Sequence, residues 1–184
     1  GYLVVFIAAI IEGALFINWY LPGSVVIVLG VVFAKEAHLN VAMVITFITL
    51  GFLLTAIMNY FLGKFGLYRL FMKLGLKAPM DRAKIKMEKY GLPVIFGTYF
   101  HPNMGALTAT SAGILKLPFT RFFLYSLAAL VAWNTLWGIA VYFFGMVIIK
   151  TLSPWTILVG LTIWILYLAI RFKNGKGKPT EIIP

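Results

Sequence analysis

The chain contains no cysteine among its 184 residues, and only five of its side chains are acidic. The lack of cysteine excludes disulfides, thiolate catalysis and cysteine-based metal sites. With two histidines and five acids, a histidine–carboxylate metal site is not expected. The sequence also lacks a serine-hydrolase context, an HExxH motif and a phosphate-loop glycine pattern. It therefore does not predict an enzyme.

Charge of either sign is scarce. Only 11% of the residues are charged, 62% are hydrophobic, and the mean hydropathy is +0.97. Soluble domains are about one quarter charged, so this composition predicts an all-α polytopic membrane protein. The net charge of +11 comes from basic residues that lie in the gaps between apolar runs. This placement is typical of orientation signals and contacts with anionic lipid, and it argues against a nucleic-acid partner.

Two apolar stretches are interrupted in a way that a simple membrane-spanning helix would avoid. The first, "EGALFINWYLPGSVVIVLG" over residues 12–30, contains a carboxylate and a Pro-Gly break. The helix expected over Ser24–Ala34 is about 16 Å long, too short for a hydrocarbon core of about 30 Å. The second break, at 102–105, separates short apolar pieces over 91–101 and 106–115. Each break therefore predicts the tip of a re-entrant hairpin that enters and leaves by one face.

The resulting prediction is one membrane domain over residues 1–172 and a basic cytoplasmic tail over 173–184. Residues 1–17 are expected to be structured helix and not a signal peptide. The order along the chain is a re-entrant segment 12–35, a span 39–63, a cytoplasmic amphipathic segment 64–89, a re-entrant segment 91–117, a span 119–149 and a span 153–171. Each half is thus a broken hairpin followed by a span, as in inverted-repeat transporters. Chance similarity between apolar helices is the alternative.

Orientation follows from the basic residues. Segment 64–89 and the C-terminal residues from Arg171 onward hold 12 of the 16 lysines and arginines, so the segment and the tail are both predicted to be cytoplasmic. Within the segment, 66–74 predicts an interfacial helix, and a second helix is expected to start near Pro79. A solvated loop is the alternative. The residues predicted to lie at the membrane surface are Lys64, Arg69, Lys73 and Lys77.

Several motifs resemble one family. "LPGSVVIVLG", "YFLGKFG", "FGTYFHPN" and "SAGILKLPFTRFFLYS" are similar to the DedA family, also called SNARE-associated or VTT-domain membrane proteins. The likeness covers about residues 10–150. It implies opposed re-entrant hairpins in the plasma membrane of a prokaryote. It also implies movement of phosphate-bearing lipids, such as polyprenyl phosphates or phospholipids, between leaflets, with proton coupling in some members.

The family's functional residues carry over only in part. The matching positions are Glu12, Pro22, Gly23, Lys64, Pro102, Gly113 and Arg121. Four positions that are usually charged in the family are neutral here: Ser24, Ala56, Tyr99 and Gly105. The resemblance therefore does not extend to an arginine clamp on phosphate.

The resulting hypothesis is a flippase or scramblase for an anionic lipid, with a cavity where two hairpin tips meet. No cofactor is expected beyond possible proton coupling, and a homo-oligomer is compatible with the sequence. The residues predicted to line the cavity are Glu12, Asn18, Pro22, Gly23, Ser24, Tyr99, His101, Pro102, Asn103, Thr108, Ser111 and Arg121. The alternative function is a membrane scaffold that retains the fold and has lost the charged transport residues.

Two further questions concern individual polar residues. A helix over 12–21 would place Glu12 about 15 Å from the first tip, in the cavity wall. An ionisable group inside a membrane is normally functional, although a structural, hydrogen-bonded glutamate is the alternative. Asn59 and Asn134 are expected to join helices and not to bind substrate.

Overall fold

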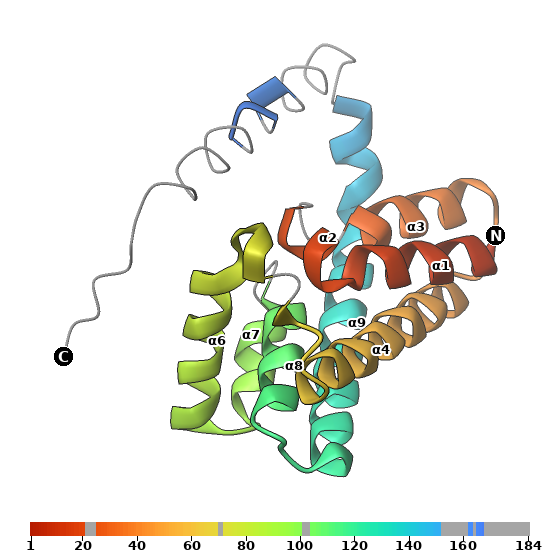
Figure 1. Cartoon of the computed structure of the whole chain (residues 1–184). Coiled ribbons are helices and arrows are strands. Elements are labelled where there is room, and N and C mark those ends of the chain that lie inside the picture. The colour runs from red at the N-terminus through yellow and green to blue at the C-terminus, as the bar shows by residue number, and fades with distance from the viewer. Residues whose placement is uncertain (21–24, 70–71, 101–103, 152–161, 164, 168–184) are drawn as a thin grey trace. The chain divides into compact units, whose positions relative to one another are not determined.

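The computed structural model describes residues 1–20, 25–69, 72–100, 104–151, 162–163 and 165–167. All regular elements in these ranges are helical (Figure 1). They are α1 (Tyr2–Gly13), α2 (Leu15–Tyr20), α3 (Val25–Glu36), α4 (Val41–Lys64), the π-helix η1 (Met72–Leu76), α6 (Lys77–Tyr90), α7 (Val94–Tyr99), α8 (Gly105–Ile114) and α9 (Phe119–Thr151). By internal contacts, residues 1–146 form one compact unit and residues 147–184 another. The packing described below is that of the first unit.

Helices α4 and α9 are the long elements of this unit. Among the described residues, Val41–Lys64 and Phe119–Gly145 are the two helical stretches long and apolar enough to cross a membrane. At 1.5 Å per residue, the 24 residues of α4 extend about 36 Å. The predicted spans 39–63 and 119–149 coincide with α4 and α9 to within two residues at each end. The predicted span 153–171 lies mostly outside the described residues.

The two long helices run antiparallel. Val44 and Ile48, in the first turns of α4, share an apolar cluster with Val141 of α9. Near the other end, the ring of Tyr60 stacks on Phe122 with centroids 4.7 Å apart. The unit therefore has an Asn40 end, where α4 begins, and a Lys64 end, where α4 stops and α9 starts.

The first broken segment enters and leaves at the Asn40 end. The backbone amide of Asn40 donates to the hydroxyl of Tyr2, at 3.3 Å. Further along, α1 runs parallel to α4 and passes so closely that a Cβ on Gly51 would lie 2.7 Å from the Cβ of Ala9. α3 then returns, because Lys35 near its end reaches Tyr142, close to the outgoing end of α9.

The second broken segment enters from the Lys64 end along α9. The ring of Phe96, in α7, lies 6.0 Å from that of Tyr125, and the ring of Phe100 lies 5.1 Å from that of Trp133. α7 therefore follows α9 toward its middle. The chain has penetrated about halfway along α9 where the described part of α7 stops.

α8 brings the chain back to the Lys64 end against α4. A Cβ on Gly113 would collide with the carbonyl oxygen of Tyr60, and one on Gly63 with that of Thr110. The two helices can approach this closely only because both positions are glycine. Beyond α8, the hydroxyl of Tyr60 donates to the carbonyl of Leu117 at 2.6 Å.

The basic segment departs from the predicted pattern. A continuous helix over 66–74 is wrong, because residues 65–68 form turns, with Gly66 at φ +78°, and Met72–Leu76 is a π-helix. The second helix begins at Lys77, directly after the π-helix, with Pro79 in its first turn. α6 then packs one apolar face inward through Met80, Ala83 and Met87.

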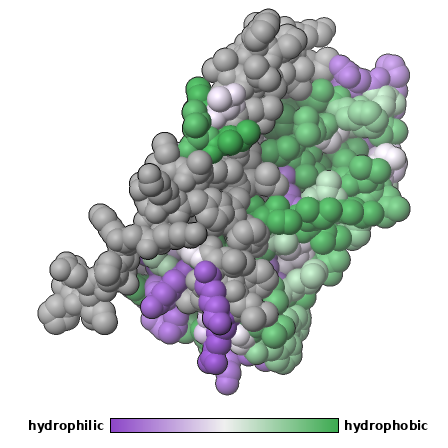
Figure 2. Space-filling view, turned by 45° about the horizontal axis from the view of Figure 1, so that its top comes forward, coloured by the Kyte–Doolittle hydropathy of each residue, from purple (hydrophilic) through white to green (hydrophobic). Residues whose placement is uncertain are grey.

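Much of the unit's surface is apolar. In Figure 2 hydrophobic side chains form a broad area, and hydrophilic side chains gather at two ends of it. The exposed large side chains on the two long helices include Leu50, Leu54 and Met58 of α4 and Leu124, Val131 and Leu136 of α9. An exposed area of this kind suits contact with lipid and would be a liability in water.

Candidate functional site

Glu12 is the acidic residue with the most unusual position. Its side chain is only 3% exposed, at the end of α1. The Oε2 atom accepts a hydrogen bond from the backbone amide of Val26, at 2.8 Å. Val26 is the second residue of α3, so its amide is one of the helix-start donors that have no partner within the helix. The carboxylate therefore links the two arms of the first broken segment and stabilises the positive end of α3.

This contact corrects the predicted location of Glu12. The helix expected over 12–21 is broken, because Ala14 adopts an extended conformation (φ −61°, ψ 138°) between α1 and α2. The chain can therefore fold back, and Glu12 lies against the start of α3. The Pro-Gly pair itself lies outside the described residues.

Two side chains of α4 fix the end of α1 around Glu12. Thr55 Oγ1 donates to the carbonyl of Ile10 at 3.1 Å, and Asn59 Nδ2 donates to the carbonyl of Gly13 at 3.0 Å. Both side chains are 2% exposed. Each satisfies a carbonyl that the end of a helix leaves without a partner. The prediction that Asn59 joins helices is confirmed.

Asn134 has the same role between the two long helices. Its Nδ2 donates to Thr49 Oγ1 at 3.0 Å, and Thr49 in turn donates to the carbonyl of Ile45. Asn134 is fully buried. A buried amide between apolar helices is costly unless it is hydrogen-bonded, so this pair favours one packing of α4 on α9.

The two broken segments meet through an apolar cluster. Leu15, at the start of α2, lies in this cluster with Ala106 and Leu107 of α8 and with Leu76 and Met80. Leu15 is 2% exposed and Leu107 is fully buried. The described parts of the two segments are therefore in direct contact.

The other predicted polar residues of the second segment lie in separate environments. Tyr99, at a position usually charged in the family, is buried and shares a hydrogen bond with Ser126 of α9, 3.1 Å between oxygens. Ser111 donates to the carbonyl of Leu107 at 2.8 Å, as a serine inside a helix commonly does. Thr108 is 1% exposed, and its Oγ1 finds no hydrogen-bond partner among the described residues.

Arg121 lies away from the described residues next to the second break. It is exposed in the first turn of α9, at the Lys64 end. Trp133, which contacts Phe100 near the second break, is twelve residues further along, about 18 Å on a helix. The prediction that Arg121 lines a cavity between the tips is therefore not supported by its place on α9. Lys64, Arg69, Lys73 and Lys77 are exposed, as expected for residues at a membrane surface.

The remaining predicted residues are only partly described. Asn18 lies on α2 and is half-buried. Pro22, Gly23, Ser24, His101, Pro102 and Asn103 lie outside the described residues.

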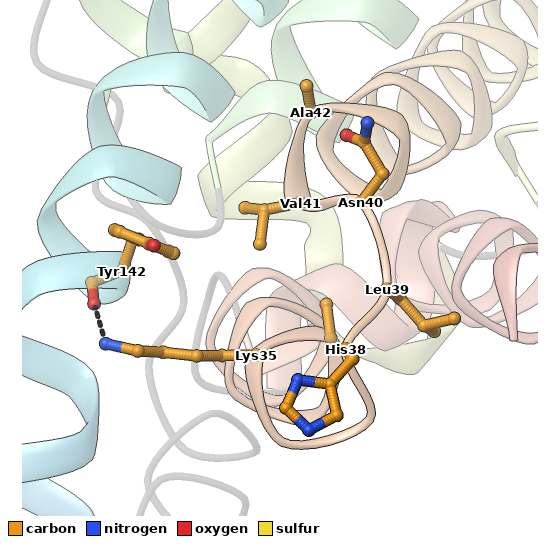
Figure 3. Close-up of a pocket in the computed structure, with 8 residues that line it drawn as sticks. Lys35, His38, Leu39, Asn40, Val41, Ala42 and Tyr142 are labelled. Carbon is orange, nitrogen blue, oxygen red and sulfur yellow. Dashed lines mark hydrogen bonds between the residues drawn. The ribbon is translucent and has the colours of Figure 1, made fainter.

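Sequence reasoning missed a polar contact at the Asn40 end. Lys35 Nζ donates to the carbonyl oxygen of Tyr142 at 3.1 Å and lies 4.6 Å from the centre of its ring (Figure 3). The lysine closes one side of an open depression of about 470 Å³. The sequence offers only a weak signal, because a lysine after an apolar run is typical of any helix end at a membrane surface.

Comparison with known proteins places these features in a family. The model of the VTT domain matches residues 21–143. An uncharacterized membrane protein of Synechocystis sp. is 25% identical over 162 residues, which cover 85% of this chain and 73% of the relative. Protein DedA of Escherichia coli is 26% identical over 152 residues, 79% of this chain and 69% of the relative.

A third relative carries a functional name. Undecaprenyl phosphate transporter A of Bacillus subtilis is 25% identical over 121 residues, which cover 63% of this chain and 61% of the transporter. The chain thus spans less than two thirds of that relative. No solved structure matches the chain. Because the domain model covers about two thirds of the sequence and contains both breaks, α4 and most of α9, the chain belongs to the VTT-domain, or DedA, family of membrane proteins.

Proposed function

We propose that the protein moves a phosphate-bearing lipid between the two leaflets of a membrane, as a flippase or scramblase. The observation that carries this proposal is the order of contacts along α4 and α9. The first broken segment enters and returns at the Asn40 end, and the second does so at the Lys64 end. Their inner parts touch between Leu15 and α8. If α4 and α9 span the bilayer, the two segments are re-entrant hairpins from opposite faces.

Such an arrangement suits an anionic headgroup. Irregular backbone at membrane depth is tolerated only when it is buried in protein or lines a water-filled space. The starts of α3 and α8 face away from the surfaces by which their hairpins enter, and helix starts present free N–H donors and a positive dipole end. These oriented N–H groups could therefore replace the hydrogen bonds that an anionic headgroup makes with water.

In this proposal Glu12 controls whether the lipid phosphate can reach the start of α3. Its carboxylate and a lipid phosphate would compete for the same donors at the start of α3, because both are anionic acceptors. Protonation of Glu12 would remove that competition and admit the phosphate. In a proton-coupled transport cycle, the proton would then bind Glu12 within the first hairpin and not in the wall of a cavity away from it. The named relative that transports undecaprenyl phosphate supports this class of cargo.

The test is reconstitution of the full chain into liposomes that contain a fluorescent phosphate-bearing lipid in both leaflets. A membrane-impermeant quencher reports the lipid that reaches the outer leaflet. We expect quenching beyond the outer half of the label, faster than in liposomes with an unrelated helical membrane protein at the same protein-to-lipid ratio. Equal rates in the two preparations would refute transport.

One observation favours the scaffold alternative. Tyr99 and Ala56, which replace charged residues of the family, are both buried, and Tyr99 is tied to Ser126. These positions have become part of the packing between helices. A correctly folded, reconstituted protein without lipid transport would favour this alternative function.

A further inference from the structure

The depression at the Asn40 end brings a cation from α3 together with α9 and the first turn of α4. Its lining includes the polar residues Lys35, His38, Asn40 and Tyr142 and the apolar residues Leu39 and Val41 (Figure 3). The volume of about 470 Å³ is open to the outside. A site of this size and openness can admit a headgroup while the attached chains remain in the apolar surroundings.

Lys35 is held in place before any ligand arrives. Its ammonium contacts both the carbonyl oxygen and the ring of Tyr142, at 3.1 Å and 4.6 Å. An ammonium has three N–H donors, and this carbonyl takes one of them. A lysine normally loses considerable side-chain entropy when it is ordered at a ligand. The two contacts with Tyr142 restrict the exposed side chain, so part of that loss has already occurred before an anion binds.

Lys35 is the charged side chain among the residues that line the depression, and none of these residues is acidic. His38 contributes an imidazole on the rim, in a left-handed conformation with φ +53° that holds the loop between α3 and α4. Asn40 is anchored there, because its Oδ1 accepts from the amide of Met43 at 3.1 Å. Glu36 is the neighbouring acid in the sequence, but it does not line the depression.

We propose that this depression binds a phosphate monoester or diester anion, with Lys35 as the residue that contacts it. A charged oxygen competes well for the ammonium, because a charge-assisted hydrogen bond is roughly twice as strong as one to a neutral carbonyl. Lysine acts on phosphate as a point charge, so one well-placed ammonium suffices for a weak, reversible site. Within the proposed function, on which this role rests, the depression holds the lipid headgroup at the Asn40 end of its route.

Protection of Lys35 from acylation tests the site directly. The full chain in a non-ionic detergent is treated with an amine-acylating reagent, and modification is followed by peptide mass spectrometry. Short-chain phosphatidic acid, at about ten times its dissociation constant, should slow acylation of Lys35 about tenfold. Lys116, an exposed lysine between α8 and α9, is the internal control and should react at an unchanged rate.

Two further ligands distinguish the source of the phosphate. If inorganic phosphate protects Lys35 as well as the lipid does, the site is an anion site for free phosphate. If only phosphatidic acid protects it, the ligand is a lipid headgroup. Protection by uncharged short-chain diacylglycerol to the same extent, or protection by neither anion, would overturn the proposal.

Variants connect the site to transport and separate the two proposals. Lys35→Gln should slow lipid movement in liposomes severalfold, Lys35→Arg should largely restore it, and Lys116→Asn should match the parent. Lipid movement by Lys35→Gln at the parental rate would overturn the role in the route. If phosphatidic acid protects Lys35 but the parent moves no lipid, the anion site stands and the proposed function fails.

Discussion

The hydrogen bond between Glu12 and Val26 gives Glu12 a structural role, and the proposed function would add a role in transport. A glutamine at position 12 can still accept from Val26 through its amide oxygen, but it cannot ionise. We therefore expect Glu12→Gln to fold normally, to move lipid more slowly and to lose any pH dependence of the rate. Glu12→Ala removes the acceptor and should also lower the free energy of unfolding, by about 1 kcal/mol, as for loss of a helix cap. Thermal unfolding and lipid movement at several pH values measure these effects.

Glu36→Gln is the matched control, because Glu36 is an exposed acid at the end of α3. It should leave both readings at the parental level. If Glu12→Gln moves lipid like the parent at every pH, the carboxylate is only a cap, and transport must depend on the hairpin tips alone.

At the level of elements, the crossing of α4 and α8 depends on Gly63 and Gly113. A Cβ at either position would meet backbone of the opposite helix, which cannot rotate away as a side chain can. Gly113→Ala should therefore push α8 from α4 and lower the free energy of unfolding by about 1–3 kcal/mol. Gly97→Ala, on α7, is the control, since a Cβ there meets nothing within 4 Å. Denaturation of the purified protein in detergent provides the measurement, and equal stability of the two variants would contradict the close crossing.

The basic segment over residues 64–89 is a second element, and its proposed role is contact with anionic lipid. α6 buries Met80, Ala83 and Met87, while most of its basic side chains are exposed. Lys84 forms a loose ion pair with Glu88, with a distance of 3.6 Å between nitrogen and oxygen. If this surface lies on anionic lipid, each basic residue contributes on the order of 1 kcal/mol, and added salt weakens the contact.

Neutralising the basic surface tests this role. We expect joint replacement of Lys73, Lys77, Lys84 and Lys86 by glutamine to make the segment more sensitive to protease in anionic liposomes. In liposomes of neutral lipid, parent and variant should be cleaved alike. Unchanged protection in anionic liposomes would refute the lipid contact.

At the level of the whole molecule, the proposed topology places the two ends of α4 on opposite sides of the membrane. Ala37 lies beyond α3 at the Asn40 end and Ala78 lies in α6, and both are exposed. The chain has no cysteine, so single substitutions report position without interference. Ala37→Cys should react with an impermeant thiol reagent in intact cells, and Ala78→Cys only after permeabilisation. Met58→Cys, on the exposed apolar side of α4, should react poorly in both cases. Labelling of Ala78→Cys in intact cells would reject the predicted orientation.

The sequence by itself determined the class of protein and its long helices. Its composition excludes a soluble fold, and the apolar runs of α4 and α9 are long enough to be recognised without any knowledge of packing. The two breaks follow from the same local signals, because proline, glycine and short apolar pieces act within a few residues. The family motifs reside in these same stretches, and the match to the VTT domain confirms them.

Only the tertiary structure decided where the polar side chains act. Glu12 meets Val26 because Ala14 leaves the helical conformation, and no periodicity in the sequence marks that bend. Similarly, Lys35 and Tyr142 are far apart in the sequence and meet only because α3 returns beside the outgoing end of α9. Local patterns encode helices and breaks, since these depend on neighbouring residues. The partner of a buried carboxylate or of an ammonium at a helix end depends on which helices pack together, and that is a property of the whole fold.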